Sequence, residues 1–336
     1  MTVSKISIAA GAAAVLAAAA VAAWMLVPAS KPPVKDVKFQ LPWTHSASYA
    51  GFYSADNNGD FAGEGLQVEF LIGGPHVDPI GLVVSGEAQM GLANGADLLR
   101  ARGSGQPVKA VACIYRLSPL VYITLKSSGI DHPGKFAGKT VRASRQNTIV
   151  LKAMISDYDI DFDSMTVVFT NDIDRMLNGE IDIWSGYSAV SLERLVDHGL
   201  DLNIMHPDNF GAHFYYSCVF STDQFINDEP EVILGFLRAS LQKGWPRAFR
   251  NPEAAAALVN NYGPEVNIGD QAKAISIMLP LVDTGTGDIG WTDADVWGAM
   301  ASELKRQGLL ETPVTGREIY DGQFIEAVFG AEGVAP

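Results

Sequence analysis

The alternation of short apolar strands with helices is the sequence feature that most limits how this chain can fold. Between residues 139 and 205 the pattern predicts strands at 139–144, 165–169, 181–184 and 202–205, separated by helices at 148–158, 173–178 and 190–198. Strands and helices that alternate at this spacing form parallel βαβ units. The sequence therefore predicts the α/β class.

Two breaks in this pattern divide the 336-residue chain into two lobes, which is also what its length suggests. The segments 127–134 and 207–213 interrupt the alternation, and beyond residue 230 the sequence is helical almost to its end. We predict a first lobe from 37–126 with 214–336 and an inserted second lobe from 127–213. Two lobes joined by two extended connections can hinge, and the cleft between them is the expected ligand site.

The first predicted strand indicates where one wall of that cleft lies. Residues 37–41 alternate between apolar and polar side chains, and Pro42 then ends the strand. This arrangement places Trp43, His45 and Tyr49 at or beyond the carboxyl end of the strand, where open α/β sheets bind small molecules. In the alternative interpretation these aromatic rings only close the top of a core.

Other predicted strand ends and helix starts supply candidate contacts. The second lobe offers two aromatic side chains, Trp184 and Tyr187, so that a flat solute would lie between rings from both lobes. The candidate polar contacts are Gly73, Gly74, Asn94, Ser144, Arg145, Gln146 and Asn147. A glycine pair lets backbone N–H groups approach a ligand, although a plain turn explains it equally well. Arg145 would meet a carboxylate or phosphate, or else face solvent.

The N-terminus carries a long apolar run. Residues 6–27 contain no charge and are rich in alanine, and Lys5 precedes them. Such a run fits a cleaved secretory signal or an uncleaved membrane anchor, and we favour the signal. The polar, proline-containing segment 31–36 would then be a tether. In either case residues 1–36 stand apart from the folded part, which we expect to be periplasmic or otherwise exported.

Charge and composition exclude several classes of function. The formal net charge is −14 without a basic cluster, so nucleic acid would be repelled. Cys113 and Cys218 lie in apolar runs, where we expect buried free thiols, with a disulfide as the alternative in an exported protein. Two cysteines cannot build a zinc-thiolate or iron–sulfur site, and the histidines show no metal spacing. We therefore predict no metal, no cofactor and no catalytic residue.

A series of short motifs runs through almost the whole of residues 37–329. They are Trp43-Thr-His45, Tyr49-Ala-Gly-Phe-Tyr53, Gly73-Gly-Pro-His-Val-Asp-Pro79, Gly179-Glu-Ile-Asp182 and Asp208-Asn-Phe-Gly211. In this order they resemble the periplasmic solute-binding proteins of ABC importers, in the branch that binds the thiamine pyrimidine precursor, riboflavin, sulfonates and nitrate. The resemblance implies a bilobed type II periplasmic-binding-protein fold with two mixed sheets, flanking helices and a helical C-terminal part.

The resemblance also implies a function. A monomer would capture a small solute, such as a thiamine precursor or a flavin-like heterocycle, by hinge closure and deliver it to an ABC permease in the inner membrane. One departure puts the ligand in question: relatives carry a Thr-Asn-Glu run where this chain has Ser188-Ala-Val-Ser-Leu-Glu193. The alternatives are a membrane-tethered sensing domain and a pyrimidine-synthase-like enzyme, although the synthases carry a cysteine-rich motif that this chain lacks.

Overall fold

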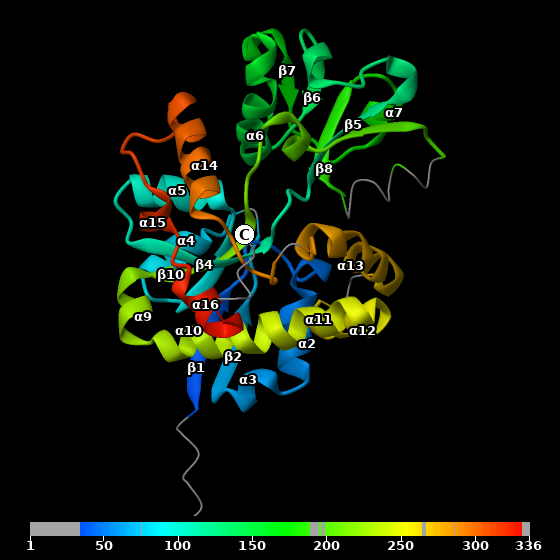
Figure 1. Ribbon diagram of the computed structural model, residues 1–336. Coiled ribbons are helices and arrows are strands. Elements are labelled where there is room, and N and C mark those ends of the chain that lie inside the picture. Colours follow the sequence, from blue (N-terminus) through cyan, green and yellow to red (C-terminus); the bar gives the residue numbers. More distant parts are fainter. Residues whose placement is uncertain are drawn as a thin grey trace, which may run out of the picture. The chain divides into compact units, whose positions relative to one another are not determined.

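The strands of the computed structural model assemble into two five-stranded sheets (Figure 1). The structure describes residues 34–74, 76–188, 195, 199–263, 267–285 and 287–330, with the backbone alone at Arg145 and Gln146. The predicted signal or anchor at 6–27 and the helix predicted at 190–198 lie outside these residues, apart from Leu195. Among the residues described, no helix is long and apolar enough to cross a membrane.

The first sheet has the strand order β2-β1-β3-β10-β4. Its strands are β1 (Lys35–Gln40), β2 (Leu66–Leu71), β3 (Met90–Ala93), β4 (Val108–Tyr115) and β10 (Tyr216–Thr222). β1 pairs in parallel with β2 and β3, whereas β10 runs antiparallel to β3 and β4. The carboxyl ends of β1, β3 and β4 therefore share one edge of the sheet, as the position of the predicted site requires.

The second sheet has the order β7-β6-β8-β5-β9. Its strands are β5 (Leu120–Leu125), β6 (Thr140–Arg142), β7 (Thr166–Val168), β8 (Ile183–Tyr187) and β9 (Leu202–Met205). β6, β7 and β8 run parallel, which confirms the predicted βαβ pattern, and β5 is antiparallel to β8 and β9. β5 thus pairs in the second sheet, although the predicted lobe boundary counts it with the first. The division into lobes stays a prediction.

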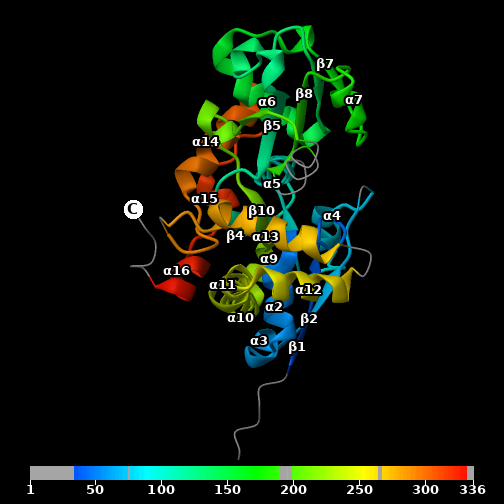
Figure 2. The ribbon, with the colours of Figure 1, turned by 90° about the vertical axis from the view of Figure 1, so that its right-hand side faces the viewer.

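Helices cover both sheets, and several of them begin at a side chain that caps the first turn. Asp78, Ser144, Thr222, Asn251 and Asn267 each accept a hydrogen bond from a backbone N–H at a helix start. The helices are α2 (Ala50–Asn57), α3 (Asp60–Gly63), α4 (Pro79–Val84), α5 (Gly95–Gly103), α6 (Arg145–Ile155), α7 (Asp174–Leu177), α9 (Asp223–Asp228), α10 (Pro230–Leu237), α11 (Trp245–Arg250), α12 (Pro252–Tyr262), α13 (Ile268–Val282), α14 (Ala294–Arg306), α15 (Gly316–Ile319) and α16 (Gln323–Phe329). The predicted helical C-terminal part is confirmed. In Figure 2, α6 lies beside β5, where the Tyr122 hydroxyl donates to the Asn147 carbonyl oxygen at 2.7 Å.

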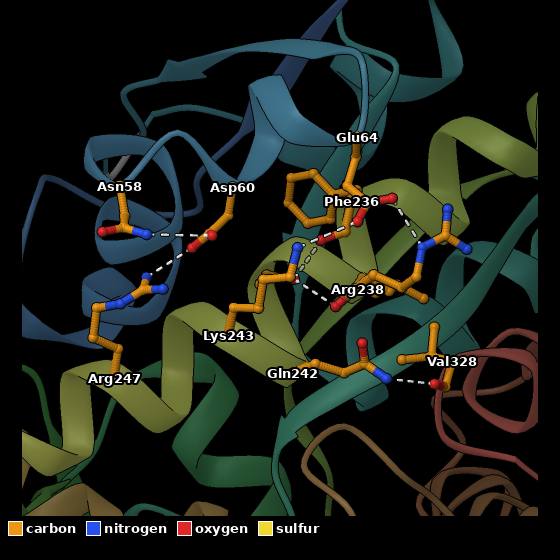
Figure 3. Close-up of polar contacts among 11 residues, drawn as sticks. Asn58, Asp60, Glu64, Phe236, Arg238, Gln242, Lys243, Arg247 and Val328 are labelled. Atoms are coloured by element: carbon orange, nitrogen blue, oxygen red, sulfur yellow. Dashed lines mark hydrogen bonds and ion pairs between the residues drawn. The ribbon is translucent and has the colours of Figure 1, made fainter.

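A π-helical segment, η7 (Arg238–Gly244), joins α10 to α11 without a break. Its last residue, Gly244, touches the backbone of Gly51 in α2, and a β-carbon at that point would collide with it. Ion pairs fix the same crossing from outside: Arg238 Nε lies 2.9 Å from Glu64 Oε2, and Arg247 Nη1 lies 2.7 Å from Asp60 Oδ2 (Figure 3). The C-terminal helices are thereby attached to the first sheet.

Cys113 in β4 and Cys218 in β10 form a disulfide, so the expectation of free thiols is wrong. The two residues are direct partners in the antiparallel register, a relation that their positions in the sequence do not reveal. Both are fully buried. The bridge joins β4 and β10 close to their tyrosines: Tyr115 lies two residues after Cys113 in β4, and Tyr216 lies two residues before Cys218 in β10.

Candidate functional site

A cavity of about 1460 Å³ is lined by residues that come from the ends of strands in both sheets. This volume exceeds the roughly 300–1,000 Å³ of a typical small-molecule pocket. We call the group Trp43, Tyr49, Asn94, Asp97 and Tyr115, from the first sheet and its connections, the first wall. Arg142, Phe169 and Tyr187, from the second sheet, form the second wall.

Most of the predicted contact residues line this cavity. They are Trp43, His45, Tyr49, Gly74, Asn94, Ser144, Asn147 and Tyr187. Gly73 and Trp184 are not among the lining residues, and the side chains of Arg145 and Gln146 lie outside the described part. The prediction that these residues bind a ligand stays a prediction, but most of them come together in one place.

Trp43 is the most open side chain of the first wall, with 52% of its surface exposed. The loop that presents it is held by a backbone hydrogen bond from Gly73 N–H to the Trp43 carbonyl oxygen at 3.1 Å. A side chain at Gly73 would collide with the backbone of Leu41 and Trp43. Gly73 therefore lets two loops meet, and its predicted contact with the ligand stays a prediction.

Trp184 does not form the opposite wall. It is only 3% exposed and packs in a separate cluster with Val121, Ile123, Met176, Ile181 and Leu195. The physical reason is its position inside β8, whereas Tyr187 is the last residue of that strand and reaches the cavity with 40% of its surface exposed. An aromatic residue in the middle of a strand packs on a sheet face and does not reach the strand end.

Phe169 and Arg142 complete the second wall, and the sequence analysis missed both. Phe169 follows the last residue of β7 and is 72% exposed, while Arg142 ends β6. The Arg142 guanidinium carbon lies 5.7 Å from the Phe169 ring centroid and 4.9 Å from that of Trp184. The rule that located Trp43, the carboxyl end of a parallel strand, would have located Phe169, which ends the strand predicted at 165–169. It would not have located Arg142, because the strand predicted at 139–144 extends past it.

The Arg142 cation is already engaged by the protein. It donates from Nε to the Thr170 carbonyl oxygen at 2.8 Å, from Nη1 to the Ser185 carbonyl oxygen at 2.6 Å and from Nη2 to Asn171 Oδ1 at 2.8 Å. These bonds use three of the five guanidinium N–H groups. They hold the Arg142 guanidinium beside the Phe169 ring.

Tyrosine hydroxyls and neutral groups supply most of the remaining polar surface. Burial raises the pKa of Tyr187 to about 12, and a hydrogen bond with Asn94 acts in the opposite direction. Burial lowers the pKa of His45, and its Nδ1 lies 2.7 Å from the Tyr53 hydroxyl. These tyrosine and histidine side chains are thus uncharged at neutral pH.

Two predicted polar contacts are occupied by bonds within the fold. Asn147 donates from Nδ2 to Ser185 Oγ at 3.1 Å, and Ser144 Oγ accepts from the Asn147 backbone N–H at 3.2 Å as the cap of α6. Their first task is to position the start of α6 against β8. Within the described ranges, no cluster of three histidine, cysteine or carboxylate side chains that could hold a metal ion is present.

Comparison with known proteins gives relatives of two kinds. The chain is 27% identical over 303 residues to the formylaminopyrimidine-binding protein of Halalkalibacterium halodurans, covering 85% of this chain and 90% of the relative. It is 23% identical to the riboflavin-binding protein RibY of Chloroflexus aurantiacus, covering 89% and 88%. A protein named 4-amino-5-hydroxymethyl-2-methylpyrimidine phosphate synthase, from Legionella pneumophila, is 25% identical, covering 73% and 79%.

Solved structures confirm the predicted fold. The periplasmic aliphatic sulphonate binding protein SsuA of Escherichia coli superposes with a TM-score of 0.65 at 12% identity, covering 87% of this chain and 93% of that one. The two mixed sheets flanked by helices are thus the periplasmic-binding-protein architecture. The family described as NMT1/THI5 like matches residues 46–255, which is more than half of the sequence. By this match and by its fold, the chain belongs to the NMT1/THI5-like family.

Proposed function

We propose that this protein is the solute-binding component of an ABC-type importer, and that it captures a small aromatic heterocycle in the cavity between the two walls. The observation that carries the proposal is the set of exposed rings around one cavity: Trp43 on the first wall, Phe169 and Tyr187 on the second. Exposed aromatic side chains are costly in water, and a flat ring that covers them gains both apolar burial and stacking.

The relatives support a heterocyclic solute. The names of two of them specify a formylaminopyrimidine and riboflavin, which are both flat nitrogen heterocycles. The predicted delivery to a permease of the inner membrane, the monomeric state and closure of the cavity on the ligand belong to the same proposal. An exported protein would also form the disulfide between Cys113 and Cys218, because such bonds persist outside the reducing cytoplasm.

We infer that the protein carries out no bond chemistry. Two relatives are named as pyrimidine phosphate synthases, which makes the enzyme a specific alternative. The sequence has two cysteines, and the disulfide consumes both, so no thiol remains for a cysteine-dependent reaction. Quantitative recovery of an unchanged ligand after prolonged incubation would support binding alone.

The test is a calorimetric titration of the full-chain protein with each of three compounds in turn: 4-amino-5-hydroxymethyl-2-methylpyrimidine, riboflavin and methanesulfonate. We expect one of the two heterocycles to bind and the sulfonate not to bind. Phe169→Ala should weaken binding of that heterocycle, because half of the ring sandwich is lost, by about tenfold. Val167→Ala is the matched control, since Val167 is exposed on the same strand but does not line the cavity. Binding of neither heterocycle would refute the proposal.

A further inference from the structure

Asp97 is a carboxylate that the fold leaves without an adequate partner. It lies in the first turn of α5 and lines the cavity, and 24% of its side chain is exposed. In the described part of the chain its nearest cation is Arg100, whose Nη1 lies 3.8 Å from Asp97 Oδ1. That distance is too long for a hydrogen bond, and the Arg100 side chain is itself 42% exposed, so solvent weakens the attraction.

The other carboxylates at the cavity have different surroundings. Asp78 accepts a hydrogen bond from the Ile80 backbone N–H at 3.1 Å and so caps α4. Glu311 is exposed to solvent, which satisfies its charge. Asp97 is the half-buried one, and within the described contacts it accepts no hydrogen bond from a side chain or from the backbone. Burial raises its pKa to about 6, with Arg100 acting against the rise and Asp78 adding to it.

The position of Asp97 relates it to the ring of Tyr187. Its negative charge is one of the influences that raise the pKa of Tyr187, and Asn94, the residue before α5, acts in the opposite direction. Asp97 and Asn94 thus stand on the first wall within electrostatic reach of the second. Both residues line the same cavity, so a flat ring that rests against Tyr187 would lie near Asp97.

Two cations also line the cavity, Arg100 and Arg142. Arg142 donates three hydrogen bonds, to Thr170, Ser185 and Asn171, and Arg100 is the ion-pair partner of Asp97 at 3.8 Å. The Asp97 carboxylate thus keeps unused capacity to accept hydrogen bonds. A carboxylate buried in this way is costly unless something donates hydrogen bonds to it, and a ligand is the donor that remains.

We propose that Asp97 determines the specificity of the site by accepting hydrogen bonds from an amino group or a ring N–H of a heteroaromatic base. The inference rests on the function proposed above and narrows its ligand to bases that carry such donors. A sulfonate or another anion would meet the Asp97 carboxylate with like charge and would be rejected. In this proposal Asp97 is a direct contact of the ligand.

The wild-type protein supplies the first test. Calorimetry compares 4-amino-5-hydroxymethyl-2-methylpyrimidine with the same pyrimidine carrying a methoxy group in place of the amino group, which cannot donate. We expect the amino compound to bind about 10- to 100-fold more tightly, because a hydrogen bond to a charged group usually contributes a binding free energy of this size. Equal affinities would overturn the inference without any need for a variant.

The second test uses Asp97→Asn, which keeps the side-chain shape and removes the charge. The ratio of the two affinities should fall at least tenfold, mainly because the amino compound binds less well. Glu253→Gln is the matched control, because it removes one negative charge from an exposed position in α12, away from the cavity. Circular dichroism and cooperative thermal unfolding show whether the Asp97→Asn variant folds. If it does not fold, the ratio of the two pyrimidine affinities of the wild-type protein decides whether the ligand's amino group is recognised.

The outcomes separate the two proposals. Tight binding of both pyrimidines that is unchanged in Asp97→Asn would refute the role of Asp97 and leave the solute-binding function standing. Failure of the wild-type protein to bind either pyrimidine or riboflavin would refute both. Tighter binding of methanesulfonate than of the pyrimidines would overturn the choice of ligand class and, with it, the role of Asp97.

Discussion

The first wall and the second wall of the cavity are built on different supports. The first wall extends from a sheet whose core is continuous with most of the described chain and whose strands β4 and β10 are joined by a disulfide. The exposed ring of the second wall, Phe169, is supported by Arg142, which in turn stacks on Trp184 in a separate cluster of six buried residues. The comparison teaches that both walls present a ring, Trp43 on the first and Phe169 on the second, but that the two rings are supported by different cores.

The largest expected change in stability comes from comparing Trp184 with Trp43, the two tryptophans that the sequence places on opposite walls. Trp184→Ala should lower the free energy of unfolding by about 3–5 kcal/mol, because it empties the centre of a small core. Trp43→Ala should change stability by less than about 1 kcal/mol, since half of that side chain is already in water. Urea unfolding measures both values.

Ligand titration of the same two variants sharpens the difference. Trp43→Ala should lose affinity for the bound heterocycle by about tenfold, because a stacking surface is removed. Trp184→Ala, at a temperature where it stays folded, should bind more weakly only through displacement of Arg142 and Phe169. Equal stabilities of the two variants would contradict the placement of Trp184 behind the second wall.

Removal of the disulfide tests the support of the first wall. Replacing Cys113 and Cys218 by alanine should lower the free energy of unfolding by about 2–4 kcal/mol, because the bond closes a long loop in the unfolded chain. The two cysteines are 105 residues apart in the sequence. A reducing agent should lower the melting temperature of the wild-type protein and leave that of the double variant unchanged. A wild-type protein insensitive to reduction would contradict the bridge.

Asp97 gives a smaller change in stability than Trp184 or the disulfide, and one of opposite sign. Its pKa is about 6 in the folded protein, against an ordinary value of 3.8, so the folded state binds protons more tightly between pH 4 and pH 6. Stability from this group is present below pH 4 and is lost as the pH rises through 6. Asp97→Asn should therefore stabilise the ligand-free protein by about 1–3 kcal/mol at pH 7.5.

The same variant should show a much smaller difference from wild type at pH 4, where the carboxyl is protonated in the folded state and close to half-protonated in the unfolded state. Thermal unfolding at the two pH values measures the effect, with Glu253→Gln as the control at each. The charged groups that influence Asp97 are Arg100 and Asp78. Asp97 in turn influences the neutral hydroxyl of Tyr187. A stabilisation of equal size at both pH values would indicate that charge is not its cause.

Strand ends explain how much of the site could be predicted from the sequence. Trp43, Asn94 and Tyr187 were found because they stand at or just beyond the end of a recognisable strand, and the helical C-terminal part was found from its periodicity. Trp184 failed as a contact because the strand continues three residues past it, to Tyr187. The exact end of a strand depends on its pairing partners, which the local pattern does not contain.

The disulfide and the role of Asp97 could not be predicted from the sequence for a related reason. The disulfide depends on the register between β4 and β10, which sets Cys113 opposite Cys218. The importance of Asp97 depends on what surrounds α5 and on which other charges are already bonded. Both are properties of segments far apart in the chain, and a single sequence without these contacts shows only an ordinary cysteine pair and an ordinary acidic residue at a helix start.

The π-helical segment between α10 and α11 fixes the length of the chain at this point. A π-helical turn holds about one residue more than an α-helical turn, so a deletion in η7 and a deletion in α10 have different consequences. Deleting one residue from η7 would restore ordinary α-helical spacing and leave the helices on either side in phase. Deleting one residue from α10 would instead turn everything after it by about 100° around the helix axis. Gly244 would then move away from Gly51, and a side chain would arrive where two backbones now touch.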